Sequence, residues 1–215
     1  MGVAPCAVAV PRLRADAMRN RERIIAAAGD AFVEHGPDVP LDAIAERAGV
    51  GNATVYRNFA DREDLLLNVA LATLDRIVGH AEASAAEADA FEALRGFVHR
   101  TAGEPLGSLC SLLCSSGVDR TDPRVTAARD RLERAVDQVM DRARATGQLR
   151  ADVARGDLLL AITQLTRPVQ GMTTAGCDRF VHRHLQVFLD GLRAPAPSVL
   201  SGTAATLEDL QRRDL

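Results

Sequence analysis

The segment that most constrains the fold is residues 41–59, LDAIAERAGVGNATVYRNF, which contains two short helical patterns separated by a turn. Apolar residues recur at helical spacing in its first half, and Val55 and Phe59 resume that spacing in its second half. Gly49-Val50-Gly51 interrupts the pattern, and glycine tolerates the positive φ that a sharp corner between helices requires. The segment therefore predicts a helix-turn-helix.

The second helix of this motif has small or polar side chains away from its apolar face. They are Asn52, Ala53, Thr54, Tyr56, Arg57 and Asn58. Such groups can donate to phosphates and reach base edges in the major groove, whereas Val55 and Phe59 should point back into the protein. We therefore interpret these six residues as a DNA-contacting surface.

The stretch AIAERAGVGNATVYRNFADREDLL resembles the DNA-binding signature of the TetR family of transcriptional regulators. The resemblance extends from about Arg19 to Val78, while the rest of the chain fits the family only in length and helical pattern. It implies an all-α fold with an N-terminal three-helix, helix-turn-helix head, residues 16–60. That head would be joined to a larger C-terminal helical domain, residues 61–193, for effector binding and dimerisation.

The match departs from the family at Pro40, where Ser or Thr is frequent, and at Gly51, where Ser is frequent. Both residues are acceptable near a helix start, although each removes a hydroxyl that could contact a phosphate. Arg62 stands where the family commonly has a phosphate-binding lysine, so the positive charge is kept. The resemblance thus adds Arg62 to the predicted DNA-binding residues.

Residues 1–15 are predicted to form a flexible arm in which Arg12 and Arg14 could rest on phosphates or in a minor groove. A solvated tail without DNA contacts fits the same composition. The whole chain has a net charge of −3, but residues 12–23 contain five arginines and two acidic residues. A local excess of positive charge is compatible with one small DNA-contacting face on an acidic protein.

The remaining pattern is helical. Helices are predicted at residues 17–35, from Asp61 as N-cap toward Ser84, at 90–101, at 106–115, from Asp122 to about 146, at 157–172 and at 180–192. Pro168 should kink the helix that contains it. Residues 194–215 contain Pro, Ala, Ser, Gly and Thr and are predicted to be a tail of uncertain order.

The last two predicted helices have apolar stripes with heptad-like gaps. The stripes consist of Leu158, Ile162, Leu165 and Val169, then Val181, Leu185, Phe188 and Leu192. Two such helices from each subunit can form a four-helix bundle, which is where the resembled family dimerises. The alternative is that both stripes are buried inside one subunit.

A small-molecule pocket is usually apolar with a few polar groups, and the candidate lining follows that composition. It comprises Phe97, Cys110, Cys114, Met140, Gln164 and Arg167. The polar members could equally form hydrogen bonds at a subunit interface. Cys110 and Cys114 lie one helical turn apart and could share a metal or an oxidant, but small core residues are the simpler interpretation.

Other classes of function find little support in the sequence. The four cysteines follow no zinc pattern, no phosphate-binding glycine loop is present, and no nucleophile has a base at recognisable spacing. We therefore predict no metal, no cofactor and no enzymatic activity. No run of about 18 apolar residues occurs, and the N-terminus lacks the basic region of a signal peptide. A reducing cytoplasm without membrane insertion is the expected location.

These observations favour a homodimeric transcriptional regulator that occupies a palindromic operator in double-stranded DNA. The resemblance implies repression that a small-molecule effector releases, although the sequence does not identify the effector. One alternative is a DNA-binding architectural protein without an effector. The other is a ligand- or redox-sensing protein whose head no longer reads DNA.

Overall fold

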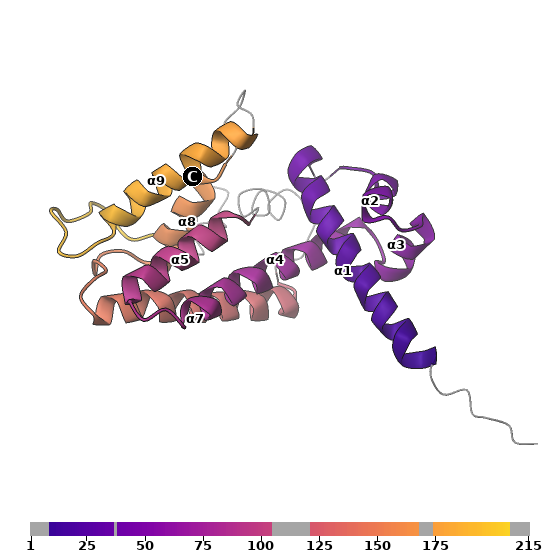
Figure 1. The fold of residues 1–215 in the computed structure, drawn as a ribbon, viewed down its shortest axis with the longest axis horizontal. Coiled ribbons are helices and arrows are strands. Elements are labelled where there is room, and N and C mark those ends of the chain that lie inside the picture. The colour runs from indigo at the N-terminus through magenta and orange to yellow at the C-terminus, as the bar shows by residue number, and fades with distance from the viewer. Residues whose placement is uncertain (1–8, 37, 105–120, 168–173, 207–215) are drawn as a thin grey trace, which may run out of the picture. The chain divides into compact units, whose positions relative to one another are not determined.

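The computed structural model describes residues 9–36, 38–104, 121–167 and 174–206, and these residues divide into two compact units (Figure 1). The first unit, here called the head, extends through Ala72, and the second, the body, begins at Thr73. The division falls inside helix α4, Arg62–Ser84. The sequence suggested a boundary before this helix, between residues 60 and 61. The first half of α4 belongs to the head because Leu65 and Leu66 are buried there.

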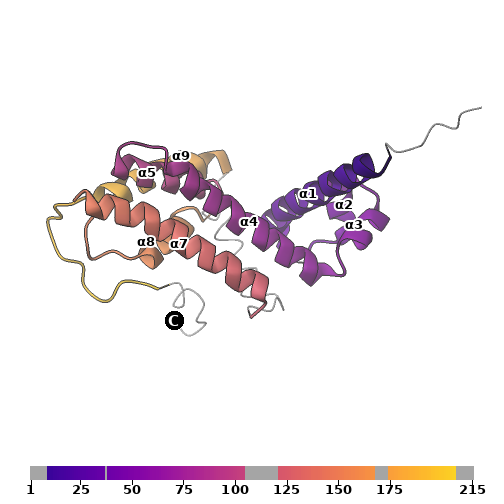
Figure 2. The ribbon, with the colours of Figure 1, turned by 90° about the horizontal axis from the view of Figure 1, so that it is seen from below.

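The head contains α1 (Ala9–His35), α2 (Leu41–Ala48) and α3 (Asn52–Asn58) together with the start of α4. Figures 1 and 2 both show α2 and α3 beside α1. Its buried residues come from all four helices and include Ile24, Ala28, Phe32, Ile44, Ala45, Val55, Phe59, Leu65 and Val69. The predicted all-α fold with an N-terminal helix-turn-helix is confirmed.

The prediction of a flexible arm over residues 1–15 is wrong for residues 9–15, because α1 begins at Ala9. Pro11 lies in the first turn of the helix, where a backbone N–H has no intrahelical acceptor and proline is therefore tolerated. The residues that follow are mostly leucine, alanine and arginine, which favour helix. The support helix is consequently eight residues longer than the apolar pattern indicated.

The corner of the helix-turn-helix depends on Gly49, which ends α2 in the left-handed conformation with φ 63°. The N–H of Gly49 donates to Glu46 O at 3.0 Å, and that of Val50 donates to Ala45 O at 3.0 Å. These bonds satisfy carbonyl groups that a helix end leaves unpaired. A side chain at position 49 would be strained by its φ, and its Cβ would lie 2.7 Å from a guanidinium nitrogen of Arg23.

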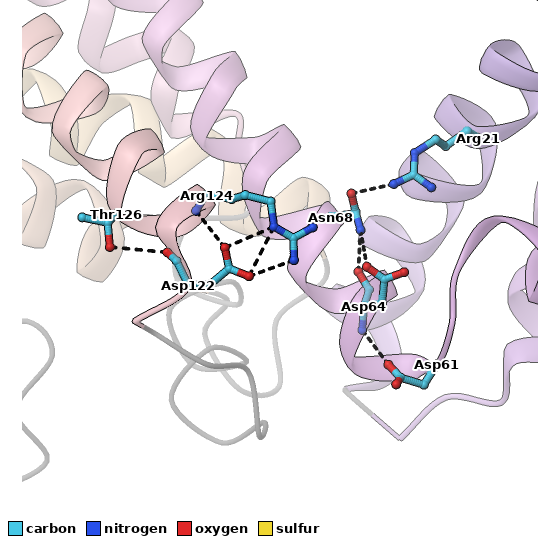
Figure 3. Close-up of polar contacts among 7 residues, drawn as sticks. All are labelled: Arg21, Asp61, Asp64, Asn68, Asp122, Arg124 and Thr126. Carbon is cyan, nitrogen blue, oxygen red and sulfur yellow. Dashed lines mark hydrogen bonds and ion pairs between the residues drawn. The ribbon is translucent and has the colours of Figure 1, made fainter.

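Polar contacts fix the start of α4 and tie it to α1 (Figure 3). Asp61 accepts from the N–H of Asp64 at 2.8 Å, which confirms its predicted role as N-cap. Arg21 of α1 donates to Asn68 Oδ1 at 2.7 Å, and the Asn68 amide donates back to the Asp64 carboxylate at 2.9 Å. This chain of hydrogen bonds sets the position of α4 within the head.

The body consists of the rest of α4 with α5 (Ala90–Ala102), α7 (Pro123–Ala145), α8 (Arg155–Leu165) and α9 (Thr174–Gly191). Asp89 and Asp122 cap α5 and α7 through the N–H groups of Phe91 and Arg124. Figure 3 shows the Asp122 contacts. Each helix in the described part of the chain is too short or too polar to span a bilayer. The predicted helix at 106–115, Pro168 and Val169 lie outside the described residues.

The apolar stripes predicted to form the dimer seam lie largely inside the body. Leu158, Ile162, Leu185 and Leu192 are at most 4% exposed and belong to the hydrophobic core of the single chain. Leu165, Val181 and Phe188 pack against that core and are partly buried. The assignment of the four buried leucine and isoleucine residues to a dimer surface is therefore wrong, because periodicity identifies a buried face but not the partner that buries it.

Residues that follow α9 are held against the beginning of α8. Arg150, only 7% exposed, donates to Ser198 O at 2.7 Å and forms a two-bond ion pair with Asp152. That pairing, with a bond from Leu200 N, holds the pKa of Asp152 well below its ordinary value. A β-carbon on Gly156 would overlap the backbone carbonyl of Ala205. Within the predicted tail of uncertain order, residues 194–215, Ser198 accepts from Arg150 and Ala205 donates to Asp157, so this part of the tail is ordered. Residues 207–215 lie outside the described residues.

Candidate nucleic-acid interface

The surface of α3 divides as the sequence predicted. Val55 and Phe59 are 1% and 3% exposed. Asn52, Ala53, Tyr56 and Arg57 are exposed, and Thr54 and Asn58 are half-buried. One side of a short helix is therefore held by the core of the head, and the other presents amide, phenol, guanidinium and small side chains to solvent.

Several of these side chains are already hydrogen-bonded. Asn52 donates from Nδ2 to Asp42 Oδ1 of α2 at 2.7 Å. Arg57 folds along its own helix and donates to Ala53 O at 3.0 Å, and Asn58 donates to Thr54 O at 2.7 Å. Tyr56 is the largest exposed side chain of α3, at 58% exposure. Tyr56 thus places a hydroxyl donor in solvent, and the amide of Asn52 is held by Asp42 of α2.

The sequence also predicts DNA contacts for three arginines outside α3, which are Arg12, Arg14 and Arg62. Arg62 is partly buried, and its guanidinium donates to Val39 O at 2.6 Å, so it ties α4 to the segment before α2. A contact between Arg62 and a phosphate stays a prediction. Residues 12 and 14 lie on the helical backbone of α1, but the side chains of Arg12 and Arg14 lie outside the described structure.

Two further arginines, Arg21 and Arg23, support the helix-turn-helix in a way that the sequence did not reveal. Arg23 donates to Ala48 O at 2.5 Å, at the end of α2. Arg21 donates to Asn58 O at 2.8 Å, at the end of α3, and its guanidinium lies 4.5 Å from the centroid of the Phe59 ring. Cations at helix C-termini complement the negative end of the helix dipole. These charges therefore support the head and do not simply add to a basic surface.

The candidate pocket residues do not share one environment. Phe97 and Met140 are fully buried in the core of the body, whereas Gln164 and Arg167 are exposed. Cys110 and Cys114 lie outside the described residues. Thr101, one helical turn after Phe97 on α5, is fully buried, and its hydroxyl has no hydrogen-bond partner among the residues that the structure describes. Assignment of these residues to an effector pocket stays a prediction.

The structure brings together two histidines that lie far apart in the sequence. His99 of α5 and His182 of α9 meet edge to face, with ring centroids 5.6 Å apart. Desolvation lowers the pKa of His99, and the nearby His182 and Arg95 lower it further. The described residues contain no group of three or more His, Cys, Asp and Glu placed to hold a metal. We therefore interpret the pair as a packing contact between α5 and α9.

We expect acid to destabilise the body through His99. Its folded pKa lies below the unfolded value of about 6.5, so the unfolded state binds more protons as the pH falls below that value. Full stability is present above about pH 6.5 and is lost on acidification. Between about pH 7.5 and about pH 5, the melting temperature should fall less for His99→Gln than for the wild-type chain. An identical loss in both proteins would contradict the coupling.

Comparison with known proteins identifies relatives of both units. The family model described as bacterial regulatory proteins, tetR family, matches residues 24–69. The model described as transcriptional regulator SbtR-like, C-terminal domain, matches residues 85–194. The first match contains α2 and α3 completely, and the second contains α5, α7, α8 and α9.

Solved structures resemble most of the chain. A TetR transcriptional regulator from Streptomyces coelicolor is 30% identical, with a TM-score of 0.63, and the match covers 82% of this chain and 99% of that one. A TetR transcription regulatory protein from Mycobacterium vanbaalenii is 33% identical, with a TM-score of 0.63, over 85% and 99% of the two chains. An HTH-type transcriptional regulator of Staphylococcus aureus is 38% identical over 69 residues, 32% of this chain, and the chain spans only 37% of that relative's length.

Proposed function

Because this chain belongs to the TetR family of bacterial regulatory proteins, we propose that it is a homodimeric regulator that binds a palindromic operator through α3. The observation that carries this proposal is the exposed side of α3, where Asn52, Tyr56 and Arg57 face solvent while Val55 and Phe59 anchor the helix. Regulation of transcription would place its action at the chromosome, in the cytoplasm.

Two heads are needed for specific binding. A single seven-residue helix can reach only a few base pairs, and two helices related by a dyad can occupy successive major grooves about 34–36 Å apart. The palindrome of the operator then mirrors the two-fold symmetry of the dimer. We propose that α8 and α9 supply the dimer contact through their outward sides, because their inward sides are buried in the body.

We further propose that the protein represses transcription and that a small molecule bound by the body releases it from DNA. Helix α4 is continuous from Arg62 in the head to Ser84 in the body, so a change in either unit can be transmitted along it. A ligand can lower DNA affinity only by binding one state more tightly than the other, and typical couplings correspond to about 5- to 150-fold. By reciprocity, operator DNA must weaken the ligand by the same factor.

Binding to randomised duplex DNA tests the proposal, and Tyr56→Phe tests the interface. We expect the wild-type protein to enrich a palindrome from the pool. Removing the Tyr56 hydroxyl should weaken binding to every DNA sequence by about tenfold, the effect of one lost hydrogen bond to a charged phosphate. Fluorescence anisotropy with the selected operator and with unrelated duplexes measures both affinities.

The control is thermal stability, which Tyr56→Phe should leave unchanged because the side chain is 58% exposed. Tyrosine carries no charge, so the dependence of affinity on salt concentration should also stay the same. Failure of the wild-type protein to enrich any sequence would contradict the proposed function. Equal affinities for the wild type and Tyr56→Phe would instead exclude Tyr56 from the interface.

A further inference from the structure

The amide of Asn52 is held from outside its own helix. Its Nδ2 donates to Asp42 Oδ1 at 2.7 Å, and Asp42 lies in the first turn of α2, ten positions earlier in the chain. The other described hydrogen bonds of α3 side chains, from Arg57 and Asn58, end on groups of α3 itself. Asn52 is thus positioned relative to α2 as well as by its own backbone.

This contact determines which way the amide faces. An ionised carboxylate can only accept hydrogen bonds, so the nitrogen of Asn52 must face Asp42 and the oxygen must face elsewhere. Without such a partner, an exposed amide can turn over and exchange its donor and acceptor positions. With Asp42 in place, Asn52 retains Oδ1 as acceptor and one further Nδ2–H as donor.

A retained acceptor beside a retained donor matches one base in the major groove. Adenine presents the N6 amino donor beside the N7 acceptor, and an Asn amide can pair with both. Guanine presents two acceptors at the same edge, so the fixed oxygen of Asn52 would oppose guanine O6. Both Asn52 and Asp42 are exposed in the head, so a base edge can approach the amide.

We propose that Asp42 is a positioning residue that fixes the Asn52 amide so that Asn52 selects adenine at one position of each half-site. This inference rests on the proposed function, because it requires that α3 reads the operator. Asp42 does not contact the base in this arrangement. Its carboxylate also weakens attraction to phosphates, so its contribution is to discrimination between bases and not to general affinity.

The test is the relative affinity of the full-length protein for operators that carry each of the four bases at every half-site position. The wild type should prefer adenine at one position by about 5- to 150-fold. Asn52→Ala should remove that preference, and Asp42→Ala should reduce it at the same position. Asp42→Ala should leave affinity for unrelated DNA equal or higher, because a negative charge is lost. Asp42→Glu, which retains a carboxylate, should restore part of the preference.

A double-mutant comparison separates positioning from support of the fold. In the Asn52→Ala background, Asp42→Ala should have no further effect at the adenine position, because both changes act through one amide. Full discrimination in Asp42→Ala would overturn the proposal. Equal loss on all DNA together with a lower melting temperature would also overturn it, since Asp42 would then only join α2 to α3. Absence of any sequence preference in the wild type would instead overturn the proposed function itself.

Discussion

Val187→Asp is expected to convert the protein to a folded monomer that has lost specific DNA binding. Val187 is 65% exposed on α9, and Phe180, two helical turns earlier, is 43% exposed on the same side. The opposite side of α9 contributes Leu185 and Leu189 to the core. If the outward side forms the dimer contact, two-fold symmetry would place the new carboxylate in the interface from both subunits, where its desolvation would cost several kcal/mol.

The expected loss of operator affinity is about a thousandfold or more, because a single head should retain little beyond nonspecific binding. Sedimentation equilibrium measures the assembly state, and fluorescence anisotropy measures operator affinity. Val199→Asp is the matched control, since it makes the same change at a residue that is 88% exposed and lies after α9. A Val187→Asp protein that stays dimeric and binds the operator normally would show that the dimer uses another surface.

Phe97→Ala is expected to destabilise the body by about 3–5 kcal/mol, the usual cost of removing a buried phenylalanine ring. Phe97 is fully buried, as are Leu94 and Val98 on the same helix. The loss is a large part of the roughly 5–15 kcal/mol that separates folded from unfolded domains. Denaturant unfolding followed by circular dichroism would measure the change.

Tyr56→Ala is the matched control, because removing an aromatic ring at a 58% exposed position outside the proposed dimer contact should cost about 0.5 kcal/mol or less. The comparison also decides between two interpretations of Phe97. A core residue loses its packing when truncated, whereas a residue that lines an open cavity loses much less. A small effect of Phe97→Ala would therefore contradict its assignment to the core and favour the sequence-based interpretation as a pocket wall.

The helix-turn-helix could be predicted because its determinants are local. Gly49 is required at a left-handed corner, and the 3.6-residue spacing assigns Val55 to the buried side of α3. Asp61 could be predicted as an N-cap because a capping side chain bonds a backbone N–H a few residues later. Each of these inferences requires only residues that are neighbours along the chain.

The positions of the charged residues could not be predicted in the same way. Arg23 lies in a basic stretch of the sequence, but it donates to Ala48 O, 25 residues later. Arg62 stands where the family commonly has a phosphate-binding lysine, and yet it donates to Val39 O. Long arginine side chains can reach any acceptor that folding brings near, and no periodicity encodes that acceptor.

The sequence by itself determined the helices, the apolar sides of most of them and the exposed surface of α3, because helix formation and amphipathicity depend on residues within a few positions. Only the tertiary structure decided which partner covers an apolar stripe. Leu158 and Leu185 have the spacing of a subunit seam but are buried within one chain. The structure alone also joined Asp42 to Asn52 and His99 to His182. Such pairings follow from the packing of whole helices, which sums many weak contacts between distant residues.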